Sequence, residues 1–222
     1  MATKRSYGEA CAAAHALDLI GERWALLVVR ELLLGPKRFT DLRAGMPHAS
    51  PNVLAQRLRE LEQDGIVRRR KLGPPAGTWV YELTEWGQDL EPVVLALGRW
   101  GSRSPLRDRD AIVSTDAIVI AMRGLFDGQR AGDLDATFAL RLGDDRFAIR
   151  VADAKIDVAR GDAENADVTI TTDAATLAAL LGNATTANDA VADGHLELVG
   201  DAGAFERLLD AVRREAPAEV NP

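Results

Sequence analysis

One face of the helix expected over residues 50–64 carries side chains that can read DNA bases. Asn and Gln pair bidentately with adenine, and Arg with guanine, in the major groove. Leucines at i, i+4 and i+7 predict the buried face of this helix, and they are Leu54, Leu58 and Leu61. The residues that remain outward or on the flanks are Asn52, Val53, Gln56, Arg57 and Arg59. A solvated polar face is the alternative, because most amphipathic helices have one.

Four cations stand in a row shortly after this helix, and they are Arg68, Arg69, Arg70 and Lys71. They lie on a predicted strand, residues 66–72, which leads into the Gly/Pro-rich loop 73–77 and returns through the alternating run 78–83. Cations beside the tip of such a ribbon can reach phosphate or the adjacent minor groove. We therefore expect Arg69, Arg70 and Lys71 to contact DNA.

Further DNA contacts are expected before and at the start of two helices. Lys37 and Arg38 precede a short helix expected over residues 39–42, with Thr40 as its cap, and are candidate phosphate contacts; a solvated loop is the alternative. Ser50 caps the next helix, where Pro at the first position costs no hydrogen bond. Thr40 and Ser50 complete the predicted contacts.

The elements that must position these side chains are mostly helices. Helices are expected over residues 9–20, 24–34, 39–42 and 50–64, followed by the hairpin and a long helix from Thr84 to about Trp100. The run Gly101-Ser102-Arg103-Ser104-Pro105 breaks this pattern. It places a domain boundary between residues 104 and 105, so that domains 1–104 and 105–222 are expected.

The second half of the chain mixes strands with helices. Strands are expected over residues 136–142, 146–151, 155–159, 166–171 and 195–199, and helices over 115–126, 173–181, 187–192 and 201–213. This order predicts an α+β domain in which helices pack on an antiparallel sheet. The first half is mainly α with a small β ribbon.

Charge separates the two halves. The net charge of −7 divides into +3 for residues 1–105 and −10 for residues 106–222. The first half can approach phosphate, and the second would be repelled by it. One cysteine, no apolar run of membrane-spanning length and no signal core predict a cytoplasmic protein without membrane insertion.

The first half resembles the HxlR-type winged-helix transcriptional regulators. The resemblance runs through Cys11, residues 16–21 (ALDLIG), 23–24 (RW), 32–39 (LLLGPKRF), 54–61 and 81–84 (YELT). It implies a homodimer, with the N-terminal helix and the helix 84–100 at the interface, on a pseudo-palindromic site in double-stranded DNA. Two recognition helices then read half-sites roughly 10 bp apart. Ala12 departs from the proline that follows the cysteine in many relatives.

The resemblance also draws attention to Cys11, because some family members sense oxidants or electrophiles through this cysteine. A sensor thiol must ionise, and a helix N-terminus or nearby cations, here Lys4 and Arg5, would lower its pKa. A small hydrophobe packed at the dimer interface is the alternative.

The second half resembles the sterol carrier protein type 2-like fold. The resemblance is carried by residues 166–173, 177–182 and 190–201, and spans about residues 115–213. It implies an apolar cavity between sheet and helices for a lipid-like effector. The candidate lining residues are Leu125, Phe126, Phe138, Phe147, Leu177, Leu180 and Leu181. A filled core that only supports dimerisation is the alternative.

Enzymatic chemistry has little support in the sequence. The three histidines lie in separate elements, and no metal-ligand spacing, phosphate loop or nucleophile motif is present. We expect no catalytic residue, metal or cofactor. The sequence favours a dimeric repressor whose second domain senses an apolar effector. A thiol switch at Cys11 with a structural second domain, and a lipid carrier with vestigial DNA binding, are the alternatives.

Overall fold

The computed structural model describes residues 6–74, 76–108, 111–214 and 218. Lys4 and Arg5, the cations expected near Cys11, lie outside these ranges. The chain forms two compact units that divide after Val94, within one helix. The domain boundary expected between residues 104 and 105 remains a prediction.

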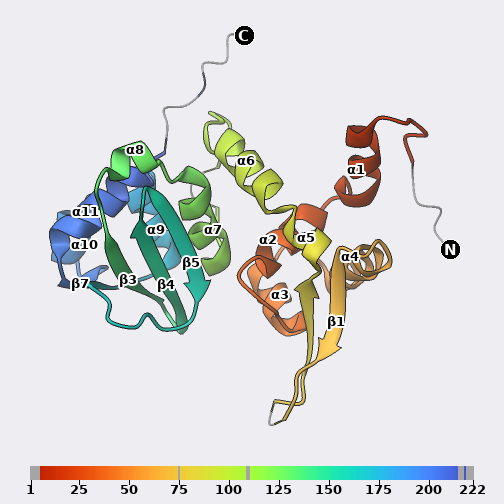
Figure 1. Cartoon of the computed structure of the whole chain (residues 1–222), viewed down its shortest axis with the longest axis horizontal. Coiled ribbons are helices and arrows are strands. Elements are labelled where there is room, and N and C mark those ends of the chain that lie inside the picture. The colour runs from red at the N-terminus through yellow and green to blue at the C-terminus, as the bar shows by residue number, and fades with distance from the viewer. Residues whose placement is uncertain (1–5, 75, 109–110, 215–217, 219–222) are drawn as a thin grey trace. The chain divides into compact units, whose positions relative to one another are not determined.

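The first unit is helical with a two-stranded ribbon (Figure 1). Its helices are α1 (Ala12–Ile20), α2 (Ala25–Leu32), α3 (Phe39–Gly45), α4 (Pro51–Gln63) and α5 (Glu85–Gln88), and α6 (Glu91–Ser102) begins in it. Strands β1 (Val67–Lys71) and β2 (Trp79–Leu83) pair antiparallel and extend away from the helices. This is the helical, winged arrangement that the sequence predicts.

Two local expectations about this unit are wrong. Arg38, and not Thr40, occupies the N-cap position of α3, because the Asp41 carboxylate accepts a hydrogen bond from the Arg38 backbone N–H. The long helix from Thr84 is divided into α5 and α6. Pro92 explains the division, because proline has no N–H to donate and its ring would clash with the carbonyl four residues earlier.

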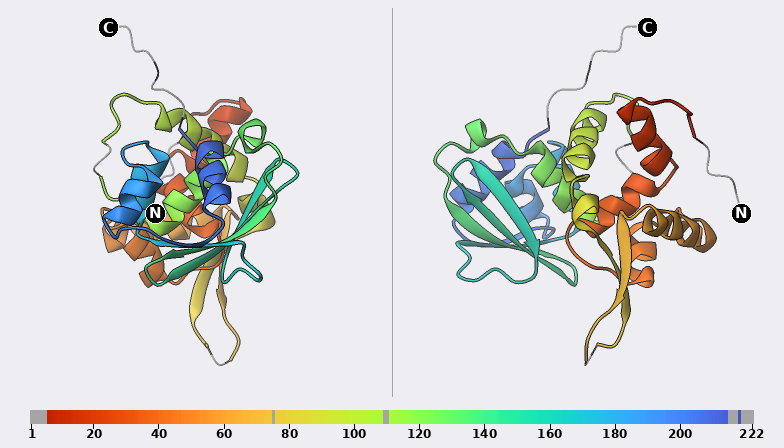
Figure 2. Two further views of the ribbon diagram at one scale, coloured as in Figure 1. Left: turned by 90° about the vertical axis from the view of Figure 1, so that its left-hand side faces the viewer. Right: turned by 45° about the vertical axis from the view of Figure 1, so that its right-hand side comes forward.

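The second unit is a five-stranded sheet covered by helices on one face (Figure 2). Its strands are β3 (Ala136–Leu142), β4 (Asp145–Ala152), β5 (Lys155–Arg160), β6 (Val168–Thr172) and β7 (Glu197–Gly200), in the order β5-β4-β3-β6-β7. Its helices are α7 (Thr115–Leu125), α8 (Gly128–Ala131), α9 (Ala174–Leu181), α10 (Ala187–Ala192) and α11 (Ala202–Ala211). The helix α8 was not expected.

The sheet is mixed, and the expectation of a purely antiparallel sheet is wrong. β6 runs parallel to β3, whereas the other neighbouring pairs are antiparallel. The cause is the connection of residues 161–167, which does not form a hairpin but carries the chain from the edge strand β5 past β4 to the far side of β3.

Most of the residues expected to line an apolar cavity form the core between sheet and helices. Buried side chains there are Leu125, Phe138, Phe147, Leu177, Leu180 and Leu181, and Phe126 is half-buried. Leu125 and Phe126 also border a cavity of about 280 Å³ that includes three arginines. Phe147 borders a second cavity, of about 310 Å³. The filled-core alternative accounts for the other four without a ligand.

Among the helices that the structure describes, none combines the length and the apolar character needed to cross a membrane.

Candidate nucleic-acid interface

α4 has one fully buried face and one polar face. Ser50 Oγ accepts a hydrogen bond from the Val53 N–H at 3.3 Å, which caps the helix, and Pro51 follows in the first turn. The three expected leucines are buried. The opposite side carries Asn52, Val53 and Arg59 in exposed positions and Gln56 half-buried. The predicted recognition face is therefore open to a partner.

A chain of hydrogen bonds crosses this face. Arg59 Nη2 donates to Gln56 Oε1 at 2.6 Å, and Gln56 Nε2 donates to Glu60 Oε1 at 2.6 Å. The Arg57 guanidinium also donates to Glu60, and its Nη2 lies 3.5 Å from Glu22 Oε2. The Arg57 side chain is only 12% exposed, so it packs against its own unit more than a flanking position predicts.

Lys37 has a structural role in this arrangement, and its contact to phosphate stays a prediction. Its Nζ donates to Glu31 Oε2 at 2.7 Å, and the Glu31 side chain is 0% exposed. Arg30 donates to the other oxygen of Glu31 at 2.8 Å. The backbone of Lys37 exchanges two hydrogen bonds with Tyr81, which ties it to β2. A Cβ at Gly45 would clash with the Glu31 carboxylate, so a side chain at this position would displace it.

Arg38 is exposed but paired. It donates to both carboxylate oxygens of Asp41, at 2.9 and 3.0 Å, and these bonds lower the pKa of Asp41 and raise the pKa of Arg38. Thr40 is exposed beside it and donates to Asp41 at 3.3 Å. Both residues can approach a phosphate, although Arg38 would have to share its charge with Asp41.

The ribbon sorts its four cations onto two faces. Arg68 and Arg70 donate to the two oxygens of Glu82 on β2, at 2.7 and 2.6 Å. Burial acts to raise the pKa of Glu82, but the hydrogen bonds and charges of Arg70 and Arg68 outweigh it and lower that pKa. Half of the positive charge of β1 is therefore shared with a carboxylate of the same ribbon.

The other face of the ribbon presents Arg69 and Lys71. The Arg69 guanidinium lies over the Trp79 ring, 4.5 Å from its centroid, and 5.9 Å from that of Tyr81. Within the described part of the chain, no carboxylate lies within 4.0 Å of Arg69 or Lys71. Cation–π stacking holds Arg69 in place and leaves its donors available.

The sequence analysis did not predict the carboxylates that pair with the candidate DNA-binding cations. Glu31, Glu60 and Glu82 each hold a cation that was assigned to DNA or placed beside it. Glu60 could have been found, because it lies three residues after Arg57 on a helix. Glu82 could have been found from the hairpin, since it pairs directly with Arg68 in the register. Glu31 required the tertiary fold.

Cys11 lies apart from these side chains, at the N-cap position of α1. Its side chain is exposed. The backbone N–H groups of Ala14 and Ala13 favour the thiolate and lower the pKa of Cys11. Exposure and a lowered pKa both favour the thiolate, which is the reactive form of a cysteine.

Comparisons with known proteins match the two parts of the chain separately. The family described as HxlR-like helix-turn-helix matches residues 19–108, and the alkyl sulfatase C-terminal family matches residues 115–218. The HTH-type transcriptional regulator YdeP of Bacillus subtilis (strain 168), itself uncharacterised, is 39% identical over 97 residues, which are 43% of this chain and 74% of YdeP.

Two solved structures overlap parts of the chain. The reduced form of the transcriptional regulator YodB from B. subtilis is 35% identical, with a TM-score of 0.39, over 44% of this chain and 97% of YodB. The inverting sec-alkylsulfatase Pisa1 from Pseudomonas sp. is 18% identical, with a TM-score of 0.45, over 48% of this chain and 17% of Pisa1. Because both overlaps are partial, the assignment rests on the sequence matches.

The second match names the alkyl sulfatase C-terminal family for the region where we expect a sterol-carrier-like domain, and that expected name remains a prediction. The first match coincides with the helices and ribbon that carry the recognition face. The chain belongs to the HxlR-like helix-turn-helix family of transcriptional regulators, and its second part resembles the C-terminal region of alkyl sulfatases.

Proposed function

We propose that the protein is a homodimeric repressor that reads a pseudo-palindromic operator with α4 and holds the flanking phosphates with its ribbon. The observation that carries this proposal is the exposed polar face of α4, opposite the buried leucines. A helix of this kind fits the major groove, where amide and guanidinium groups distinguish the base pairs.

We assign base and phosphate contacts from the exposure of each side chain and from the ion pairs that it already makes. Asn52, Val53, Gln56 and Arg59 are assigned to bases, with Val53 offering an apolar contact to a thymine methyl. Gln56 and Arg59 must exchange their bonds to each other and to Glu60 for bonds to DNA. Contacts to phosphate are assigned to Thr40, Ser50, Arg69, Arg70 and Lys71.

Dimerisation is supported by apolar side chains that the chain alone leaves exposed. Val93, Leu97 and Trp100 recur at i, i+4 and i+7 on α6, and each is at least 46% exposed. Leu17 on α1 is 49% exposed. A second copy that covers these side chains would present two α4 helices, and a two-fold operator with half-sites roughly 10 bp apart would match them.

Fluorescence anisotropy tests the DNA assignment. The full chain is titrated onto duplex DNA from upstream of its own gene and onto a scrambled duplex, across a salt series. If that DNA is not the operator, the duplex is taken instead from selection out of a random library. Tight, sequence-dependent binding with a steep salt slope is expected.

Gln56→Ala should weaken cognate binding and leave scrambled binding unchanged. Gln88→Ala, the same change at an exposed position of α5, is the matched control. Equal affinity for selected and scrambled DNA would contradict the proposal and favour a carrier with vestigial DNA binding.

We also propose that the second part senses a small-molecule effector. An effector can alter DNA affinity only by its differential affinity for the DNA-competent and DNA-incompetent states, and about 1.4 kcal/mol corresponds to a tenfold change. Adding candidate fatty acids and sterols to the anisotropy assay tests this step. Unchanged DNA affinity with a ligand that is shown to bind would contradict it.

A thiol switch is the second candidate, because Cys11 is exposed and its pKa is lowered at the start of α1. Hydrogen peroxide or a benzoquinone should then release DNA from the wild-type protein and leave Cys11→Ser bound. The chain contains no other cysteine that could account for a thiol response. Release from Cys11→Ser at the same oxidant concentration would contradict this candidate.

A further inference from the structure

Two arginines on the sheet face opposite the helices of the second unit have no carboxylate partner among the described residues. Arg141 on β3 and Arg146 on β4 pair directly in the antiparallel register, so their side chains leave the sheet on the same face. Arg146 Nη1 donates to the backbone oxygens of Gly143 and Asp145, at 2.6 and 3.1 Å, which orients the guanidinium. These carbonyl oxygens are neutral, so they do not compensate its positive charge. Of the residues that the structure describes, none offers a carboxylate oxygen within 4.0 Å of either guanidinium.

This pairing is unfavourable unless something else lies between the two groups, because like charges directly opposite each other destabilise a pair of strands. Carboxylates are abundant nearby, since residues 106–222 carry a net charge of −10. Other arginines of the sheet use them: Arg150 pairs with Asp135, and Arg160 pairs with Asp116 and Asp145. Arg141 and Arg146 are thus two adjacent uncompensated cations in an acidic unit.

A loop covers the sheet beside these arginines. The Gly161 N–H donates to Arg146 O at 2.8 Å, where the strand pairing ends. At the other end of the loop, the Asp167 N–H donates to Thr137 O at 2.8 Å, and Asp167 Oδ2 accepts from the Thr137 N–H at 2.8 Å. The loop is therefore held at both ends and crosses the sheet between them. A cavity of about 310 Å³ lies between the loop and the sheet.

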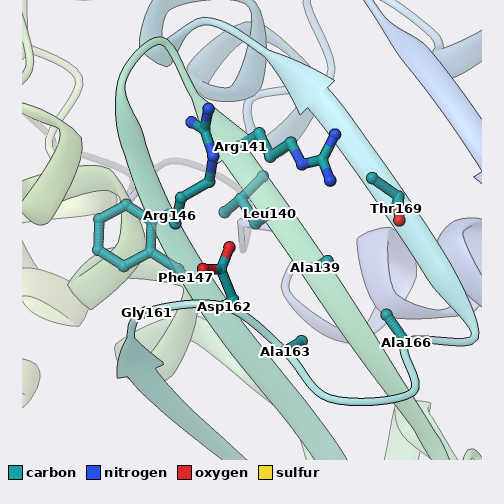
Figure 3. A pocket seen from close by; sticks show the side chains of 10 residues that line it. All are labelled: Ala139, Leu140, Arg141, Arg146, Phe147, Gly161, Asp162, Ala163, Ala166 and Thr169. Atoms are coloured by element: carbon teal, nitrogen blue, oxygen red, sulfur yellow. The ribbon is translucent and has the colours of Figure 1, made fainter.

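Charge lies at one end of this cavity and small side chains lie at the other. Figure 3 shows Arg141 and Arg146 together at one end, and Ala139, Ala163 and Ala166 toward the other. The alanines leave space that larger side chains would fill. The volume is at the lower end of the roughly 300–1,000 Å³ that small-molecule sites enclose.

We propose that this cavity, lined by Ala139, Arg141, Arg146, Asp162, Ala163 and Ala166 and here called the open-face cavity, binds a small organic monoanion. Its carboxylate or sulfate ester group lies between the two guanidinium groups, whose forked donors match the oxygens of such anions. Its short apolar body lies against the three alanines. The carboxylate of Asp162, on the loop, opposes negative charge and so favours a monoanion over a phosphate monoester dianion.

The open-face cavity lies on the side of the sheet opposite the core that we expected to hold an apolar effector. The site goes beyond the proposed function, because it assigns an anionic ligand to a cavity outside the core and does not depend on DNA binding. Whether the ligand changes DNA affinity is a separate measurement, so the two proposals can fail independently.

Isothermal titration calorimetry of the full chain tests the site with four probes: hexyl sulfate, hexanoate, 1-hexanol and inorganic sulfate. At least one of the two organic anions, hexyl sulfate or hexanoate, should bind. It should bind at least tenfold more tightly than hexanol and inorganic sulfate. Arg141→Gln and Arg146→Gln should each weaken binding at least tenfold. Asp162→Asn should tighten it severalfold. Arg141→Gln relieves like-charge repulsion, so its melting temperature should not fall, which separates loss of the site from loss of the fold. Arg146→Gln also removes the bonds to Gly143 and Asp145, so Arg141→Gln is the deciding variant.

Arg150→Gln is the matched control, because it removes an arginine of the same sheet face that is paired with Asp135 and does not border the cavity. Its affinity for the bound anion should equal that of the wild type. No binding of either anion at millimolar concentration would overturn the proposal. So would equal binding of hexanol, or variants at Arg141 and Arg146 that bind like the wild type.

Discussion

At the scale of single residues, the pairing of each cation decides what it can do for DNA. Arg69 is exposed, is stacked on Trp79, and has no carboxylate close by in the described residues. We expect Arg69→Ala to weaken binding to cognate and scrambled duplexes alike and to reduce the slope of log K against log salt by about 1. Arg68→Ala should change the slope less, because Arg68 shares its charge with Glu82. Anisotropy across a salt series measures both, and equal slopes for both variants would contradict this account.

Arg57 shows how far burial changes a prediction made from a helical wheel. Its side chain is 12% exposed and bonds to Glu60 and Glu22. We expect Arg57→Ala to lower the free energy of unfolding by about 1 kcal/mol, since a partly buried charged hydrogen bond is lost. Urea denaturation measures this loss. The matched change Arg59→Ala, at an exposed position of the same helix, should leave stability within about 0.5 kcal/mol and weaken DNA binding instead.

At the scale of elements, Glu31 joins α2 to the segment before α3. Lys37→Ala removes one cation partner of Glu31 and leaves Arg30. We expect Lys37→Ala to lower the free energy of unfolding by about 2 kcal/mol. Breaking an isolated buried ion pair costs roughly 3–5 kcal/mol, and the loss is smaller here because Arg30 still compensates the Glu31 carboxylate. The salt slope of DNA binding should be unchanged. Lys71→Ala, at the exposed end of β1, should give the opposite result: unchanged stability in urea and a smaller slope.

The ribbon depends on pH through Glu82. The pKa of Glu82 is lowered in the folded chain, so its contribution to stability is complete above the ordinary value of 4.5 and is lost as the pH falls below that value. Glu82→Gln should remove this part of the acid sensitivity. Glu82→Gln should also steepen the salt dependence of DNA binding at neutral pH, because Arg68 and Arg70 no longer share their charge with a carboxylate. Thermal melting from pH 3 to 7 and anisotropy at pH 7 measure the two effects, and an unchanged slope would show that neither arginine reaches phosphate.

Local signals account for what the sequence predicted well. The recognition helix could be located because its cap, its first-turn proline and its leucine spacing all lie within residues 50–63. The strands β3 and β4 could be located because buried and exposed residues alternate along them. The division between α5 and α6 was not predicted, although Pro92 is a local signal for it.

Features that depend on distant residues could not be predicted. The parallel pairing of β3 with β6 follows from a crossover, which leaves no mark on the alternation within either strand. The neutralisation of Lys37 by Glu31 depends on how α2 meets the loop before α3. The open-face cavity depends on hydrogen bonds that hold both ends of the loop 161–167 to the sheet. These are tertiary arrangements, and local propensity carries no information about them.

At the scale of the whole molecule, the apolar residues of α6 predict an assembly. Val93, Leu97 and Trp100 follow the spacing of one helix face, and water contact with such a face is costly at roughly 25 cal/mol per Å². We expect the full chain to be a dimer by light scattering, and Leu97→Glu to shift it to a monomer. Because a monomer offers one recognition helix where the operator has two half-sites, operator affinity should fall at least a hundredfold, whereas binding to scrambled DNA should fall far less. The control is Val191→Glu on α10, which places the same charge at a position that is 47% exposed, close to the 49% of Leu97. If Val191→Glu dissociates the dimer and Leu97→Glu does not, the dimer interface includes α10 and the assignment to α6 is wrong.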